Sequence, residues 1–328
     1  MTYENKKLGA FIVPTGIGAS IGGYAGDASV YARKFAKYTN LIVNPNVVNA
    51  GCFSGITQNM LYTEGFTLDC FFKNEINLVP AEDNKIGIIY DRAIPEDVLN
   101  IHINTQNAVK TVYGVNISEY VITAQKVGVN FYLTNNGVAT GSVNNISTII
   151  DAAKYLIKKG CNAIGIVCLF EDPEDTNTDY ANGSGPDPVG GVEAIISHCI
   201  SKYFKIPCAH SPAFTDFSIT TNIVNSKAAS EYITPTFLPC ILLGLSNAPQ
   251  ISSDKNKGIN ISNLDFLVMP HNSLGATPVF EALSRNIKIY AVEENVTELE
   301  VTNKRLFKNQ NIIEIPTYDE CLEIILKS

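Results

Sequence analysis

The residues best suited to bind a ligand lie in a glycine-rich run, residues 14–27, which reads PTGIGASIGGYAGD. The run follows a strand-like apolar stretch and precedes a helix-like one. In that position, free backbone N–H groups and the start of a helix attract negative charge, and glycines let a ligand approach the backbone closely. The pattern predicts a cradle for an anionic group, formed by Thr15, Gly16, Gly18, Gly22 and Gly23.

Two common glycine-rich templates do not fit this run. A dinucleotide-binding loop has the spacing G-x-G-x-x-G, whereas Gly16, Gly18 and Gly22 are spaced one residue wider. The acid that would bind the ribose is replaced by Asn44, and a Walker loop would need lysine where this run has Tyr24. NAD and ATP are therefore disfavoured, and we predict no cofactor.

The glycines and the acid at the end of the run also have purely structural explanations. The glycines could serve only to let a strand and a helix pack closely. Asp27 could serve only to cap the helix that we expect from residue 28 onward. The sequence leaves both alternatives open.

Polar residues also follow several other predicted strands. Ligands of open α/β sheets bind at the carboxyl ends of strands, so these residues are candidates for the same site. Proton transfer near neutral pH favours imidazole, so His210 and His271, together with Asp27, are the candidate catalytic residues. A structural hydrogen-bonding role is equally open for each histidine. The other candidate ligand-binding residues are Asn44, Asn46, Asn49, Asp187, Asn272 and Ser273.

The spacing of ligand-type side chains does not favour metal chemistry. Residues 175–186 open like a calcium-binding loop but lack its glycine and its final glutamate. The eight cysteines contain no Cys-x-x-Cys pair, which indicates reduced and mostly buried thiols. A zinc site from His198, His210 and Asp187 stays open, but no helical spacing supports it. We therefore predict metal-independent acid–base chemistry.

Strand-like and helix-like stretches alternate along the chain, and residues 147–159 carry the clearest helical stripe. This alternation predicts an α/β fold of mostly parallel sheets flanked by helices and wound into two lobes. Residues 120–123 and 127–134 look like paired strands, which predicts a small antiparallel hairpin element. We place the lobe boundary there, with an N-terminal lobe of residues 1–140 that carries the glycine-rich turn and a C-terminal lobe of residues 141–328.

Composition limits the classes of partner. The chain of 328 residues has a net charge of −8 and no basic cluster, which disfavours nucleic acid and anionic membranes. No apolar run reaches the length of a membrane-spanning helix, and residues 1–8 do not resemble a signal peptide. We expect a cytoplasmic protein, or a stromal one in a photosynthetic eukaryote, and a homodimer is a further expectation.

Several longer motifs resemble those of domain-of-unknown-function family 3326. They are VPTGIGASIGGYAGD ending at Asp27, NPNVVN at residues 44–49, GPDPVGGVEAIISH ending at His198, PCAHSP at residues 207–212 and TFLPCILLGLS at residues 236–246. The resemblance covers nearly the whole chain. It implies relatives of cyanobacterial or plastid type and supplies no activity.

A second, local resemblance is to aspartate/glutamate racemases. It rests on FLVMPHNSLG at residues 266–275, a helix, and IKIYAV at residues 287–292. In that family a catalytic cysteine precedes the Asn-Ser/Thr pair, whereas this chain has His271 there. The difference argues against a two-thiol mechanism.

Together these observations predict an enzyme that acts on a small anionic metabolite bound at the carboxyl ends of strands. Isomerase, lyase and hydrolase chemistry all fit the candidate residues. The alternative is a non-catalytic metabolite-binding or regulatory protein on the same fold.

Overall fold

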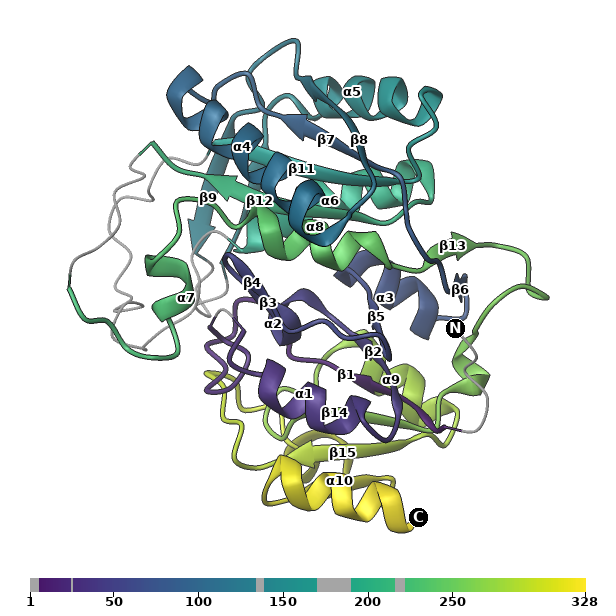
Figure 1. Ribbon diagram of the computed structural model, residues 1–328. Helices are drawn as coiled ribbons and strands as arrows, with labels where there is room; N and C mark the ends of the chain where they lie inside the picture. The colour runs from purple at the N-terminus through teal and green to yellow at the C-terminus, as the bar shows by residue number, and fades with distance from the viewer. Residues whose placement is uncertain (1–5, 25, 134–138, 170–189, 216–221) are drawn as a thin grey trace.

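The computed structural model describes residues 6–24, 26–133, 139–169, 190–215 and 222–328. Its core consists of two parallel sheets flanked by helices, which confirms the predicted α/β class (Figure 1). The six-stranded sheet runs in the order β16 (Ile312–Ile315), β15 (Lys288–Val292), β14 (Phe266–Pro270), β1 (Leu8–Phe11), β2 (Asn40–Val43) and β5 (Met60–Tyr62). The four-stranded sheet runs in the order β12 (Cys208–Ala213), β11 (Ala163–Leu169), β7 (Ile86–Tyr90) and β8 (Ile117–Ile122).

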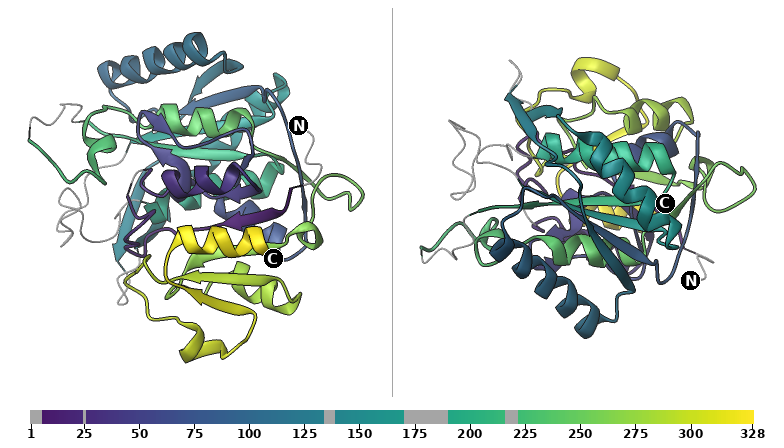
Figure 2. Two further views of the ribbon diagram at one scale, coloured as in Figure 1. Left: turned by 60° about the horizontal axis from the view of Figure 1, so that its bottom comes forward. Right: turned by 90° about the horizontal axis from the view of Figure 1, so that it is seen from above.

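Helices cover both faces of each sheet. Side chains of β1 alternate between two core clusters: Phe11 packs with α1 and α10, while Ala10 packs with α3 and α9. In the other sheet, α4 and α5 lie on opposite sides, as the view from above in Figure 2 shows. The helices are α1 (Ser29–Ala36), α2 (Pro45–Val48), α3 (Gly65–Phe72), α4 (Glu96–Tyr113), α5 (Ile146–Lys158), α6 (Gly190–Phe204), α7 (Ala229–Tyr232), α8 (Leu238–Ser246), α9 (Thr277–Ser284) and α10 (Tyr318–Lys327).

The two sheets do not divide at the expected boundary near residue 140. Strand β1 pairs in parallel with β14, so the six-stranded sheet combines the two ends of the chain. The four-stranded sheet likewise takes β7 and β8 from before residue 140 and β11 and β12 from after it. Which strands pair depends on contacts between residues far apart in sequence. The local shift to a hairpin-like pattern near residue 140 contains no information about those contacts.

The expected pairing of residues 120–123 with residues 127–134 is wrong. Strand β8 instead extends the four-stranded sheet, in parallel with β7. The antiparallel hairpin is formed by β9 (Val129–Leu133) and β10 (Ala139–Val143). Two smaller antiparallel pairs are β3 (Asn49–Ala50) with β4 (Phe53–Ser54), and β6 (Asn77–Val79) with β13 (Gln250–Ser252).

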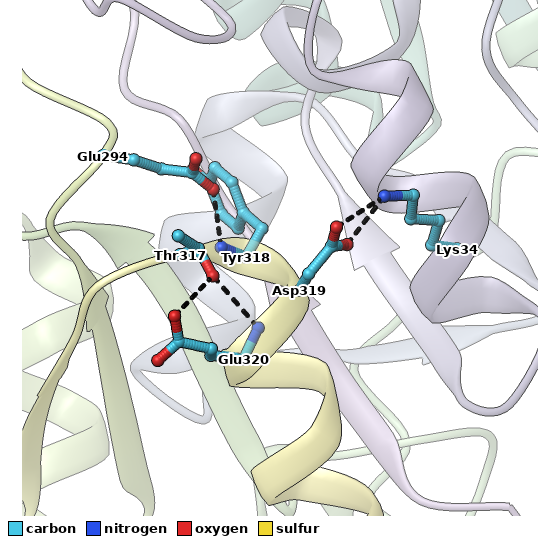
Figure 3. A network of polar contacts seen from close by, with 6 residues as sticks. All are labelled: Lys34, Glu294, Thr317, Tyr318, Asp319 and Glu320. Carbon is cyan, nitrogen blue, oxygen red and sulfur yellow. Dashed lines mark hydrogen bonds and ion pairs between the residues drawn. The ribbon is translucent and has the colours of Figure 1, made fainter.

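The C-terminal helix α10 packs on β15 and β16 of the six-stranded sheet, beside α1 (Figure 3). Its first turn is capped by Thr317, whose hydroxyl accepts the amide of Glu320. Lys34 of α1 forms an ion pair of 2.7 Å with Asp319, which contributes little because both side chains are exposed. The buried ring of Tyr318 stacks edge-on against Phe11 at 4.9 Å, so apolar packing holds the helix in place.

Among the described residues, no helix is both long enough and apolar enough to span a bilayer.

Candidate functional site

The glycine-rich turn is held against the loop that follows β15. The amide of Ser20 donates to the carbonyl of Val296 at 2.7 Å, and the amide of Glu298 donates to the carbonyl of Ile17 at 2.9 Å. The Asn295 side chain binds both backbone groups of Ile21, at 3.1 and 2.7 Å. These contacts fix the turn at the carboxyl end of the six-stranded sheet, where the sequence places it.

Two glycines of the turn differ in what surrounds them. Gly22 has φ of +82°, and a Cβ atom there would lie 2.8 Å from the side chain of Val13. Gly16 has φ of +71°, but no heavy atom of the described residues lies within 4 Å of the corresponding position. Close packing therefore explains Gly22, whereas Gly16 borders open space.

This difference predicts a measurable gap in stability. Both Gly22→Ala and Gly16→Ala carry the cost of a positive φ, about 1–2 kcal/mol. Gly22→Ala adds overpacking against Val13, so we expect it to cost at least about 1 kcal/mol more in urea unfolding. Equal losses would show that Val13 yields freely and that packing does not determine the glycine.

The backbone amides of the turn fall into two groups. The amides of Ser20, Ile21 and Gly22 donate within the protein. Those of residues 15–19 donate no hydrogen bond within the described part of the chain. Beside them, the Thr15 hydroxyl donates to Asn46 Oδ1 at 3.4 Å. The amides of residues 20–22 are thus engaged, which leaves residues 15–19, and Gly23 beyond them, as the part of the expected residues 15–23 whose amides donate no hydrogen bond within the described part of the chain.

Asp27 binds the main chain of this turn and does not cap a helix. Helix α1 begins at Ser29 with Ala28 as its N-cap residue, so the expected capping role is wrong. Asp27 Oδ1 instead accepts the amide of Gly22 at 2.6 Å. Its buried Oδ2 has no partner among the described residues.

The environment of Asp27 sets its protonation near neutral pH. Burial raises its pKa to about 6, against the opposing effects of the Gly22 amide and the charge of Lys227. Lys227 donates to the carbonyl of Ser20 and lies 5.8 Å from the ring centre of Tyr24. A cation and a carboxyl group of raised pKa therefore flank the same turn.

The expected asparagine ligands mostly bind the protein's own main chain. Asn44 accepts the amide of Val13 at 3.1 Å and donates to its carbonyl at 2.7 Å. Asn272 binds Thr297 and Leu299 through three hydrogen bonds of 2.7–3.0 Å. Asn49 Nδ2 donates to Tyr62 Oη, and the neighbour of Asn272, Ser273, donates through Oγ to the carbonyl of Pro270.

The candidate histidines lie in different environments. His271 follows β14 at the carboxyl end of the six-stranded sheet, and its buried Nδ1 has no partner among the described residues. His210 does not follow a strand as expected, because β12 continues to Ala213. It is hydrogen bonded through Nδ1 to Ser197 Oγ at 2.9 Å. Burial, helped by the nearby His198, lowers the pKa of His210 to about 3, so its imidazole stays neutral.

His198 contacts the start of α3, a helix that packs on the six-stranded sheet. Its Nε2 accepts the amide of Phe66 in the first turn of α3 at 3.1 Å. That bond occupies one of the two ring nitrogens through which a metal could bind. Within the described residues, no three His, Cys, Asp or Glu side chains are grouped as a metal site. Asp187 lies outside the described residues.

Glu64, a buried ionisable residue that contacts residues far along the chain, was not among the residues predicted from the sequence. Glu64 is 7% exposed, and its Oε1 accepts the hydroxyl of Tyr62 at 2.9 Å. Burial raises its pKa to about 8. It lines a cavity of about 10 Å³ together with Pro207 and Leu245, and this volume is room for about one water molecule. Glu64 follows β5, which is only three residues long and was not recognised as a strand in the sequence. Its position after a strand end therefore gave no signal.

Comparisons with known proteins identify the family. The model of a family described as a protein of unknown function, DUF3326, matches residues 9–327. An uncharacterized lipoprotein of Synechococcus is 36% identical over 296 residues, which cover 88% of this chain and 82% of that protein. The search of solved structures gave no match. This chain belongs to the DUF3326 family.

Proposed function

We propose that this protein is an enzyme that binds a small anionic metabolite at residues 15–19 and moves a proton through Asp27. The observation that carries the proposal is the buried carboxyl group of Asp27, which has a pKa of about 6 and accepts the Gly22 amide in the same turn that holds the unengaged amides of residues 15–19. Perturbed carboxyl groups at the carboxyl end of a sheet are typical of functional sites.

Backbone amides support the choice of an anion. The N–H groups of residues 15–19 have no acceptor within the described part of the chain, and a carboxylate or phosphate oxygen would supply one. Lys227 adds a positive charge at the same turn. In a chain with a net charge of −8, such a local arrangement is needed to attract an anion.

Asp27 supports acid–base chemistry. A group with a pKa of about 6 exchanges its proton readily near neutral pH, which is the condition for general acid–base catalysis. One oxygen is oriented by the Gly22 amide, which leaves Oδ2 as the reacting atom. His271, which follows the neighbouring strand β14, is the second candidate for the proton relay. Isomerase, lyase and hydrolase reactions can all use such an acid–base pair.

The test first screens for ligands and then measures whether the protein turns over the ligands that bind. Small carboxylates, phosphates and matched neutral compounds are screened by thermal shift, and a ligand at 100 times its dissociation constant should add about 2.7 kcal/mol of stability. For each hit, turnover is compared between wild type and Asp27→Asn. We expect a loss of about 100-fold or more in kcat for the variant, with binding retained.

The pH profile provides the specific readout. Because the pKa of Asp27 is about 6, kcat/KM should rise through that pH if the carboxylate is the base, and Asp27→Asn should lack the rise. Asp319→Asn, at an exposed carboxylate that pairs with Lys34, is the matched control. It should keep the turnover and the pH profile of the wild type. Full turnover in Asp27→Asn would overturn the catalytic role, and binding without turnover of any hit would favour the regulatory alternative.

A further inference from the structure

One edge of the four-stranded sheet is β8, and no strand of the described residues pairs with its outer side. Strand β8 pairs with β7 and with no other strand among the described residues. The amide of Thr123 donates to the carbonyl of Tyr90 in β7. Backbone polar groups alternate sides along a strand, so the N–H and C=O groups of Tyr120 and Ile122 point away from the sheet.

The side chains of this edge do not protect it from pairing. Tyr120 is 40% exposed and Ile122 is 41% exposed, and the strand contains neither proline nor lysine. Natural edge strands are usually protected by charges, proline or a covering segment. The strand has a single charged residue, Glu119, which accepts a hydrogen bond from Tyr155 of α5. Lys110 covers the carbonyl of Ile117, which leaves the end around Tyr120 and Ile122 open.

We propose that a second copy of this chain pairs with β8 in antiparallel fashion, so that the two four-stranded sheets form one continuous eight-stranded sheet. With Val121 on the two-fold axis, Tyr120 of each copy lies opposite Ile122 of the other. Both are hydrogen-bonding positions, so all four outward-pointing groups on each strand find partners. The facing aromatic and β-branched side chains stabilise such a pair further.

Symmetry and charge favour a second copy over a foreign strand. The register is self-complementary, so the contact closes after two subunits and does not propagate. In it, Glu119 faces Thr123 and no two like charges meet. Residues 85–169, which include this edge, contain seven Lys and Arg against five Asp and Glu, a net charge of +2. The acidic excess of the chain therefore lies elsewhere and opposes this approach only weakly.

Oligomeric state in solution tests the proposal. Light scattering on the eluting full-length protein at tens of micromolar should give a dimer. Ile122→Lys should raise the dissociation constant of the dimer by at least 100-fold, because it places two lysines across the axis. Ile324→Lys is the matched control, since Ile324 of α10 is 40% exposed. This control should remain dimeric.

Hydrogen exchange supplies a second readout that needs no substitution. The amides of Tyr120 and Ile122 should exchange more slowly as the protein concentration rises through the dissociation constant, while exposed amides of α10 should not. A monomeric wild type, a dimer unaffected by Ile122→Lys, or exchange at these amides that ignores concentration would each overturn the proposal.

Discussion

Asn272→Ala is expected to lower the free energy of unfolding by about 2–4 kcal/mol. The side chain of Asn272 is 7% exposed and makes three hydrogen bonds to the loop that follows β15. Alanine would leave the carbonyls of Thr297 and Leu299 and the amide of Thr297 without partners. Each unsatisfied buried group costs about 1–3 kcal/mol, partly relieved by water.

Asn46→Ala is the matched control. Asn46 is only partly buried, and its side chain accepts the Thr15 hydroxyl at 3.4 Å. We expect a loss below about 0.5 kcal/mol in urea unfolding, as at most surface positions. The two variants also distinguish a structural role from a ligand-binding role. If Asn272→Ala lost ligand affinity without losing stability, Asn272 would be a ligand-binding residue.

Glu64→Gln is expected to stabilise the protein at alkaline pH. Glutamine keeps the shape of the side chain and cannot ionise, whereas the pKa of Glu64 is raised to about 8 by burial. The folded state holds the proton more tightly than the unfolded state, whose pKa is near 4.5. The wild type therefore has full stability below the unfolded pKa and loses it as pH rises toward 8.

The size of this effect follows from the linkage between protonation and folding. A difference of one pH unit within this window corresponds to about 1.4 kcal/mol. Between pH 5 and pH 8, the stability of Glu64→Gln relative to wild type should therefore grow by roughly 3 kcal/mol. Asp27 adds its own dependence to both proteins, but only up to a pH of about 6.

Urea unfolding at several pH values measures this difference directly. Glu323→Gln, at a side chain that is 69% exposed, is the control and should show no comparable trend. A constant difference between wild type and Glu64→Gln across this range would mean that Glu64 is charged in the folded protein at pH 7. Its cavity would then contain water and be in contact with the solvent.

Local sequence patterns predicted much of the secondary structure. The helical stripe at residues 147–159 corresponds to α5 and the apolar stretch at residues 287–292 to β15, and each pattern reports local burial over a few residues. Glycines between a strand and a helix likewise located the turn that residues 14–27 form. These features depend on neighbours within one or two turns of chain, and the sequence by itself determines them.

Tertiary structure decided which side chains are free to act. Asn44 and Asn272 follow strands, as ligand-binding residues do, yet their amides bind Val13 and the loop after β15. The pKa of Glu64 is raised by burial among residues that include Pro207 and Leu245, far along the chain. Hydrogen bonding and desolvation depend on those distant contacts, and a local pattern contains no information about them.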